Sequence, residues 1–153
     1  MKKVLFVCTG NTCRSPMAEV ILNKLSEKES FIIASSAGIS IFPGSKTSLN
    51  SRDVVLKNLG VDLKDRYAVQ LTEEHIEEQD LILSMTESIK KTLADAFPFH
   101  SNKIFSLCEY AGESGNVVDP FGGELYLYEK TFVQLEKLIG RAFLKIKEEE
   151  GII

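Results

Sequence analysis

Residues 4–25 read VLFVCTGNTCRSPMAEVILNKL, and this stretch decides the fold. Its first part, Val4–Cys8, is a continuous apolar run with β-branched and aromatic side chains, which is typical of a buried strand in a parallel sheet. Apolar residues then recur at helical spacing after Pro16, with Ser15 as a candidate N-cap. We therefore expect a strand, a loop from Cys8 to Ser15, and a helix that begins at about Pro16.

The rest of the chain continues to alternate between strand and helix patterns. The further strands are expected at 31–37, 80–85 and 103–107, and the further helices at 48–59, 87–96 and 125–149. This order predicts an α/β fold, a small doubly wound four-stranded parallel sheet with helices on both faces. A ligand is then expected at the carboxyl ends of the strands. We expect residues 1–153 to form a single domain.

The composition is that of an ordinary globular protein. The chain has 153 residues, of which 44% are hydrophobic and 26% charged. A chain of this length can bury about two thirds of its unfolded surface, so it needs no disulfide or structural metal to fold. The net charge of −4 argues against broad nucleic-acid binding, which requires a basic face. We expect no nucleic-acid partner, and any anion site must be local.

The sequence shows no sign of a membrane segment. Only five apolar residues separate the N-terminal lysines from Thr9, too few for a signal peptide, and no run of about 18 apolar residues follows. We therefore expect a cytoplasmic protein, where its three cysteines remain thiols. No grouping of Cys and His has the spacing of a zinc site, so we expect neither metal nor cofactor.

The loop from Cys8 to Ser15 is suited to bind an anion. A loop of this length can curl so that its N–H groups point inward, beside the positive end of the helix dipole. Gly10 and Asn11 are the residue types that most readily adopt the positive φ angles which such a curl requires at some positions. Arg14 adds a planar fork for two phosphate oxygens. We therefore expect this loop to bind phosphate.

Cys8 is the candidate nucleophile. The inward N–H groups, the helix terminus and Arg14 all stabilise a thiolate over a thiol, and the Ser15 hydroxyl can donate a hydrogen bond to the sulfur. A lone cysteine in this place would instead be a small apolar residue at the end of a buried strand. The spacing Cys-x5-Arg-Ser between a strand and a helix favours the nucleophile over that alternative.

Four motifs, in order along almost the whole chain, resemble the low-molecular-weight protein-tyrosine phosphatase family. They are VCTGNTCRSPMAE at 7–19, SAG at 36–38, DLILSM at 80–85 and DPFGG at 119–123. The resemblance implies that Cys8 attacks phosphorus to form a phosphocysteine and that Arg14 holds the phosphoryl oxygens. It also implies that Asp119 protonates the leaving group and then deprotonates the water that hydrolyses the intermediate, a role for which positioned acids are well suited. Alone, Asp-Pro before Gly-Gly would predict a turn, which is compatible with this role.

The resemblance also assigns residues that shape the site. The substrate-binding residues that it implies are Thr9, Gly10, Asn11, Thr12, Cys13, Ser15 and Phe121. Asn11, Ser15 and Ser36 match family positions whose hydrogen bonds hold the loop in shape. Many relatives have a histidine near Arg66, so the support of the loop at that position stays open.

Cys13 is a second thiol inside the loop. The resemblance implies that it can form a reversible disulfide with Cys8 under oxidation, and a thiolate beside another thiol is the usual arrangement of a redox-sensitive site. The alternative is a role in packing alone. We expect Cys108, farther along the chain, to belong to the core.

Two features bear on the substrate. Relatives that favour phosphotyrosine usually have an aliphatic residue in place of Thr12 and aromatic residues after the Asp-Pro pair, whereas this chain has Thr12 and a single Phe121 before two glycines. This combination resembles the bacterial protein-arginine phosphatase branch. A phosphoguanidinium group is planar and rich in N–H donors, so a threonine hydroxyl can bond to it. We expect phosphorylated proteins as substrates, with phosphoarginine favoured over phosphotyrosine.

Other classes are less compatible with the sequence. Arsenate reductases with this loop need two further neighbouring cysteines, and only Cys108 lies outside the loop. A non-catalytic phosphate-binding module or a cysteine phosphocarrier would keep the loop but would not need Asp119. We expect the protein to be a monomer.

Overall fold

A four-stranded sheet forms the centre of the structure, a computed structural model that describes residues 1–29 and 31–152. The strands are β1 (Lys2–Cys8), β2 (Ile32–Gly38), β3 (Leu81–Ser84) and β4 (Ile104–Ser106). All pairs are parallel, and the order across the sheet is β2-β1-β3-β4. Because β1 occupies a central position, its carboxyl end at Cys8 lies where the chain order reverses, the usual ligand position of such sheets.

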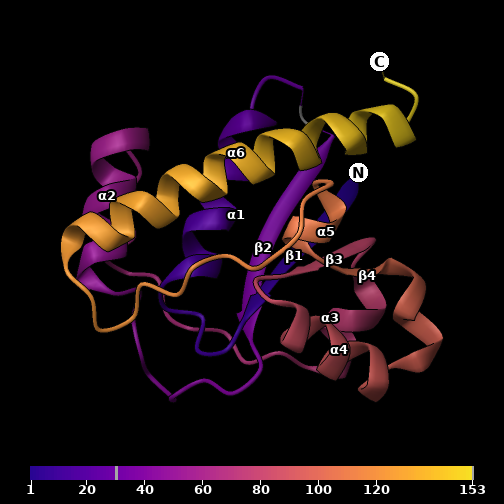
Figure 1. The fold of residues 1–153 in the computed structure, drawn as a ribbon, viewed down its shortest axis with the longest axis horizontal. Coiled ribbons are helices and arrows are strands. Elements are labelled where there is room, and N and C mark those ends of the chain that lie inside the picture. The colour runs from indigo at the N-terminus through magenta and orange to yellow at the C-terminus, as the bar shows by residue number, and fades with distance from the viewer. Residues whose placement is uncertain (30, 153) are drawn as a thin grey trace.

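Helices cover both faces of the sheet (Figure 1). They are α1 (Arg14–Leu25), α2 (Leu49–Leu59), α3 (Glu73–Glu78), α4 (Glu87–Ala96), the 3₁₀ helix η1 (Pro98–Lys103), α5 (Leu107–Tyr110) and α6 (Leu125–Glu149). Buried residues of α1, α2, α5 and α6 share one apolar cluster with alternate residues of β1, whereas α3 and α4 pack on its other side chains. The predicted four-stranded α/β fold is confirmed.

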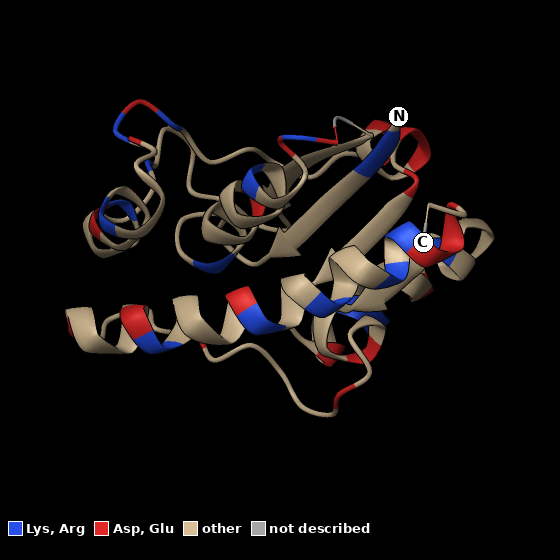
Figure 2. Cartoon of the chain, turned by 90° about the horizontal axis from the view of Figure 1, so that it is seen from above, with Lys and Arg blue, Asp and Glu red and all other residues tan. Residues whose placement is uncertain are grey.

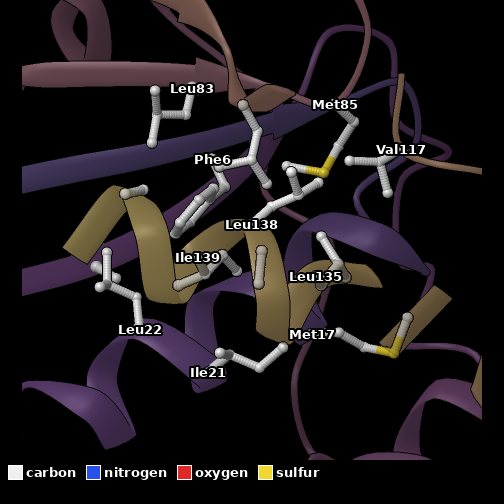
Figure 3. Close-up of a cluster of buried hydrophobic side chains, with 14 of the residues drawn as sticks. Phe6, Met17, Ile21, Leu22, Leu83, Met85, Val117, Leu135, Leu138 and Ile139 are labelled. Atoms are coloured by element: carbon white, nitrogen blue, oxygen red, sulfur yellow. The ribbon is translucent and has the colours of Figure 1, made fainter. Parts of the chain in front are cut away.

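The larger cluster joins the beginning of the chain to its end. Figure 3 shows Phe6 of β1 beside Ile139 and Leu138 of α6, with Leu22 and Met17 of α1 on the far side of that helix. These side chains are almost completely buried, and each such burial is worth about 1.5–3 kcal/mol. The packing therefore fixes the end of β1 and the start of α1, and the loop between them is held at both ends.

The first helix begins earlier than the sequence pattern predicts. It starts at Arg14, with Cys13 as N-cap and no side-chain cap, and not at about Pro16 with Ser15 as cap. The reason is that the Ser15 hydroxyl contacts Cys8 and Asn11 instead of a helix N–H group. Pro16 still fits, because proline is tolerated throughout the first turn.

Three short elements escape the periodic patterns. The helices α3 and α5 span six and four residues, and each begins with a capping box. The box of α5, Ser106 with Glu109, also ends β4 one residue before the predicted Leu107. The 3₁₀ helix η1 follows α4. The helices at 87–96 and 125–149 agree with the prediction at both ends.

The surface mixes charges of both signs. In Figure 2 the positive and negative residues are interspersed along α6 and on the elements around it, so neither sign gathers into a large patch on that face. In the part of the chain that the structure describes, none of the helices combines the length and the apolar character needed to cross a bilayer.

Candidate active site

A pocket of about 300 Å³ opens at the carboxyl end of β1. Its lining consists of Cys8, Thr9, Gly10, Asn11, Thr12, Cys13, Arg14, Asp119 and Phe121. Two segments more than 100 residues apart in sequence therefore meet here, as the resemblance predicts. Of the expected loop residues, Ser15 alone does not line the pocket.

The Cys8 sulfur lies at the floor of this pocket with two hydrogen-bond partners. Its Sγ is 2.7 Å from the Ser15 Oγ and 3.1 Å from the backbone nitrogen of Asn11, which donates to it. Both the Ser15 hydroxyl and the Asn11 N–H group are able to donate a hydrogen bond to the sulfur. Cys8 is almost fully buried, so the sulfur is accessible only from the pocket. Ser15 does not line the pocket and contacts the sulfur from within the protein.

Asn11 holds the curl of the loop. Among the non-glycine residues that the structure describes, it alone has a positive φ, of 56°, whereas Gly10 does not adopt the positive φ that its residue type allows. The Asn11 Nδ2 donates to Ser15 Oγ (2.8 Å) and Ser36 Oγ (3.0 Å), and its Oδ1 accepts from the Val69 backbone nitrogen (2.8 Å). A fully buried amide is thus satisfied on both sides.

Arg66 also supports the loop, which the sequence left open. Its Nη1 lies 3.3 Å from Asn11 Oδ1, and its Nη2 donates to Ser36 Oγ and to Glu19 Oε1, the latter at 3.2 Å. Ser36 in turn donates to the same Glu19 oxygen at 2.8 Å. The guanidinium and the carboxylate are both largely shielded from solvent, so their attraction is screened less than that of a surface ion pair. Glu19 and Arg66 were missed as a pair because 47 residues separate them in the sequence.

The close approach of β2 to the loop depends on a glycine. A Cβ on Gly38 would lie 2.7 Å from the Thr9 carbonyl oxygen and 3.0 Å from the Asn11 nitrogen. Any larger residue would therefore displace the loop backbone. This explains in physical terms why glycine follows Ser36-Ala37 at the end of β2.

Arg14 connects the phosphate-binding loop to the segment that carries Asp119. Its side chain is buried, and its Nη1 donates to the Val117 carbonyl oxygen at 3.1 Å. The Nη2 lies 3.7 Å from Asp119 Oδ2. The guanidinium is therefore anchored on one edge and faces the pocket with the remaining donors, as binding of a phosphoryl group requires.

Asp119 also lines the pocket and lies on a tight turn. Its Oδ1 accepts a hydrogen bond from the Phe121 nitrogen at 3.1 Å, and the Gly123 nitrogen donates to the Pro120 carbonyl at 2.8 Å. The carboxyl remains about half exposed. The turn predicted from Asp-Pro-Phe-Gly-Gly is present, and it presents a carboxyl group both to the pocket and to solvent.

Cys13 contacts α6 through a residue that the sequence did not single out. The Tyr128 hydroxyl lies 3.6 Å from the Cys13 sulfur, and the Ser48 hydroxyl 3.7 Å from it. Burial raises the pKa of Tyr128 to about 12, and its hydrogen bond to Cys13 contributes to the rise. Cys108 is buried in the main cluster, as expected, and burial raises the pKa of its thiol.

Thr12 and Phe121 both line the pocket. Thr12 is half-buried, and its carbonyl oxygen accepts a hydrogen bond from the Ser48 nitrogen at 2.9 Å. Phe121 is largely exposed, with 78% of its surface accessible. These two residues thus offer a hydroxyl and an aromatic ring to a group attached to the phosphate.

Comparisons with known proteins agree with this geometry. Residues 3–151 match the family model described as low molecular weight phosphotyrosine protein phosphatase. A protein-arginine-phosphatase of Bacillus subtilis is 36% identical over 149 residues, which are 95% of this chain and 97% of that protein. The crystal structure of a low molecular weight protein tyrosine phosphatase from T. tengcongensis is 41% identical, with a TM-score of 0.91 over 95% of this chain and 99% of that one. A YwlE arginine phosphatase mutant, described with a phosphorylated active-site serine in place of a cysteine, superimposes with a TM-score of 0.90 at 35% identity and 99% coverage of both chains.

Proposed function

Because the chain belongs to the low molecular weight phosphotyrosine protein phosphatase family, we propose that it is a cysteine-dependent protein phosphatase that removes phosphate from arginine residues. The observation that carries the proposal is the meeting of Cys8, Arg14 and Asp119 in one pocket whose wall includes the Thr12 hydroxyl. We further propose that the whole of residues 1–153 is one phosphatase domain and that it acts in the cytoplasm, where its thiols stay reduced.

The first chemical step is the transfer of the phosphoryl group to Cys8. The thiolate attacks phosphorus, the S–P bond forms, and the P–N bond to the arginine side chain breaks. Arg14 holds two phosphoryl oxygens, and Asp119 gives its proton to the departing nitrogen. Proton donation by a positioned acid is typically worth about 10²–10⁴-fold in rate.

The second step returns the enzyme to its starting state. Asp119, now a carboxylate, takes a proton from water, and the water oxygen attacks phosphorus while the S–P bond breaks. The Ser15 hydroxyl, 2.7 Å from the sulfur, stabilises the thiolate that leaves. The phosphorylated serine in the name of the YwlE mutant supports a covalent intermediate at the equivalent position.

The preference for phosphoarginine rests on the Thr12 side chain and on the relatives named protein-arginine-phosphatase. In a desolvated pocket, a donor-rich guanidinium gains from a nearby hydroxyl, whereas a phenyl ring does not. A tyrosine phosphatase is the second candidate, since the T. tengcongensis neighbour carries that name.

The test is kcat/KM for matched peptides with phosphoarginine or phosphotyrosine, measured for the wild type, Thr12→Ile and Cys8→Ser. We expect phosphoarginine to be the better substrate of the wild type. Thr12→Ile should lower the phosphoarginine rate by roughly ten- to a hundredfold, the cost of a lost hydrogen bond in a buried site, and leave the phosphotyrosine rate unchanged or higher. An unchanged ratio of the two rates would remove Thr12 from specificity. Turnover by Cys8→Ser at the wild-type rate would leave only a phosphate-binding role for the loop.

A further inference from the structure

The backbone just before Asp119 is attached to α6 by one amide side chain. The Gln134 Oε1 accepts a hydrogen bond from the Val118 nitrogen at 3.0 Å, and its Nε2 donates to the Asn116 carbonyl oxygen, also at 3.0 Å. Gln134 does not line the pocket. It therefore contacts the segment that carries Asp119 from behind.

A second residue of the same helix completes the attachment. Thr131 is buried, and its hydroxyl donates to the Val118 carbonyl oxygen at 3.3 Å. Both polar backbone groups of Val118 are thus bonded to α6. Val117 is bonded to other parts of the protein. Its nitrogen donates to the carbonyl oxygen of Met85, next to β3, at 3.0 Å, and its carbonyl oxygen accepts from Arg14 of α1.

Beyond Val118 the chain is held by the buried Pro120 and by the contact of Asp119 with Arg14. Asp119 and Phe121 are exposed, and the hydrogen bonds of their turn are local to residues 119–123. The place of the Asp119 carboxyl in the pocket therefore depends on its contact with Arg14 and also on the direction in which the chain leaves Val118. That direction depends on Gln134 and Thr131.

We propose that Gln134 is a positioning residue for general acid catalysis, holding Val118 and Asn116 so that the Asp119 carboxyl faces the leaving group. This inference rests on the proposed function, in which Asp119 is the acid. A primary amide suits the task because it supplies one donor and one acceptor at once. Glutamate keeps the acceptor and loses the donor, and leucine has neither.

The kinetic consequence is selective. A misplacement of the acid by about 1 Å can cost about a hundredfold in rate, but only where the reaction needs the acid. Gln134→Leu should therefore slow turnover of aryl phosphates with poor leaving groups by about ten- to a hundredfold and change p-nitrophenyl phosphate little. Gln134→Glu should fall between Gln134→Leu and the wild type.

The experiment compares Gln134→Leu, Gln134→Glu and the matched control Glu136→Gln, an exposed position on the same helix, across a series of leaving groups. Each change is also made in an Asp119→Asn background. We expect Gln134→Leu to cost nothing further in that background, because it acts through Asp119. Hydrogen exchange at the Val118 amide should be about fivefold faster in Gln134→Leu than in the control, as expected for the loss of a hydrogen bond of about 1 kcal/mol.

The outcomes separate two failures. If Asp119→Asn leaves the poor leaving groups at the wild-type rate, the acid assignment fails and the role of Gln134 fails with it. If Asp119→Asn is slow but Gln134→Leu matches the control, only the positioning role is wrong. An equal loss across all leaving groups, or the same loss with Asp119→Asn, would mean that Gln134 supports the fold or Arg14 and not the acid.

Discussion

Replacement of Asn11 tests how the phosphate-binding loop keeps its shape. The Asn11 side chain makes hydrogen bonds with Ser15, Ser36, Val69 and the charged Arg66. Loss of all of them removes about 1 kcal/mol for each neutral bond and somewhat more for the bond to Arg66. Val69 is an exposed residue, so its N–H group can bond to water, and the two serines keep other partners. We therefore expect Asn11→Gly to lose about 3 kcal/mol of unfolding free energy.

Alanine at the same position should lose more than glycine. Both variants lack the side-chain bonds, but at a φ of 56° an alanine Cβ meets steric strain of about 1–2 kcal/mol that glycine avoids. Part of this difference is offset because glycine loses more backbone freedom on folding. We expect Asn11→Ala to be less stable than Asn11→Gly by about 1 kcal/mol.

The measurement is urea unfolding of the wild type and both variants, followed by circular dichroism. A thermal scan should show Asn11→Gly melting about 6–12 °C lower than the wild type, since a protein of this size shifts by about 2–4 °C per kcal/mol. Equal stability of the two variants would show that the left-handed backbone is not maintained in solution. A loss below about 1 kcal/mol for both would show that the amide network contributes little.

Three further predictions concern neighbouring groups. Cys13→Ser should make recovery from peroxide inactivation poorer, because it cannot trap an oxidised Cys8; mass spectrometry that finds no Cys8–Cys13 disulfide in the treated wild type would contradict this. Arg66→Met should destabilise the protein by about 2–3 kcal/mol, because it leaves the Glu19 carboxylate without its charged partner. Adding Glu19→Gln should restore part of the lost stability, as measured by urea unfolding. Strictly additive losses of stability would show that the two residues are not coupled. In the folded state the pKa of Tyr128 is raised from 10 to about 12, so folding favours the neutral phenol. This preference stabilises the fold fully below pH 10, and the stabilisation is lost as the pH rises toward 12. Between pH 10 and 12 the unfolding free energy of Tyr128→Phe should therefore fall less steeply than that of the wild type. Identical slopes for the two proteins would contradict this prediction.

Much of the fold can be predicted because its strands and long helices carry periodic patterns. The apolar run before Cys8 and the three-to-four-residue spacing along α6 each reflect which faces are buried. The start of α1 could not be placed, because a serine looks like an N-cap whether or not its hydroxyl is used elsewhere. In this protein Ser15 bonds to Cys8 and Asn11.

The pocket residues were also accessible to sequence reasoning, since most of them lie in one short loop. The residues that hold the pocket residues in place could not be predicted in this way. Arg66 reaches Asn11 across 55 residues, and Tyr128 reaches Cys13 across 115. No local pattern relates positions so far apart, because their meeting is a product of the tertiary packing and not of periodicity or turn chemistry. Gln134 likewise reads as an ordinary half-exposed residue of a long helix.

The shared core of β1, α1 and α6 (Figure 3) has a consequence for synthesis of the protein. A ribosome completes Cys8 and Arg14 first, but Asp119 and the helix that holds its backbone emerge in the last quarter of the chain. A nascent chain can form the loop from Cys8 to Ser15 early and still lack Asp119 and the part of the apolar cover of β1 that α6 supplies. Contacts between residues far apart in the sequence form slowly. Enzymatic activity should therefore appear only with the final folding step. The time at which turnover appears then reports when α6 docks on the rest of the protein.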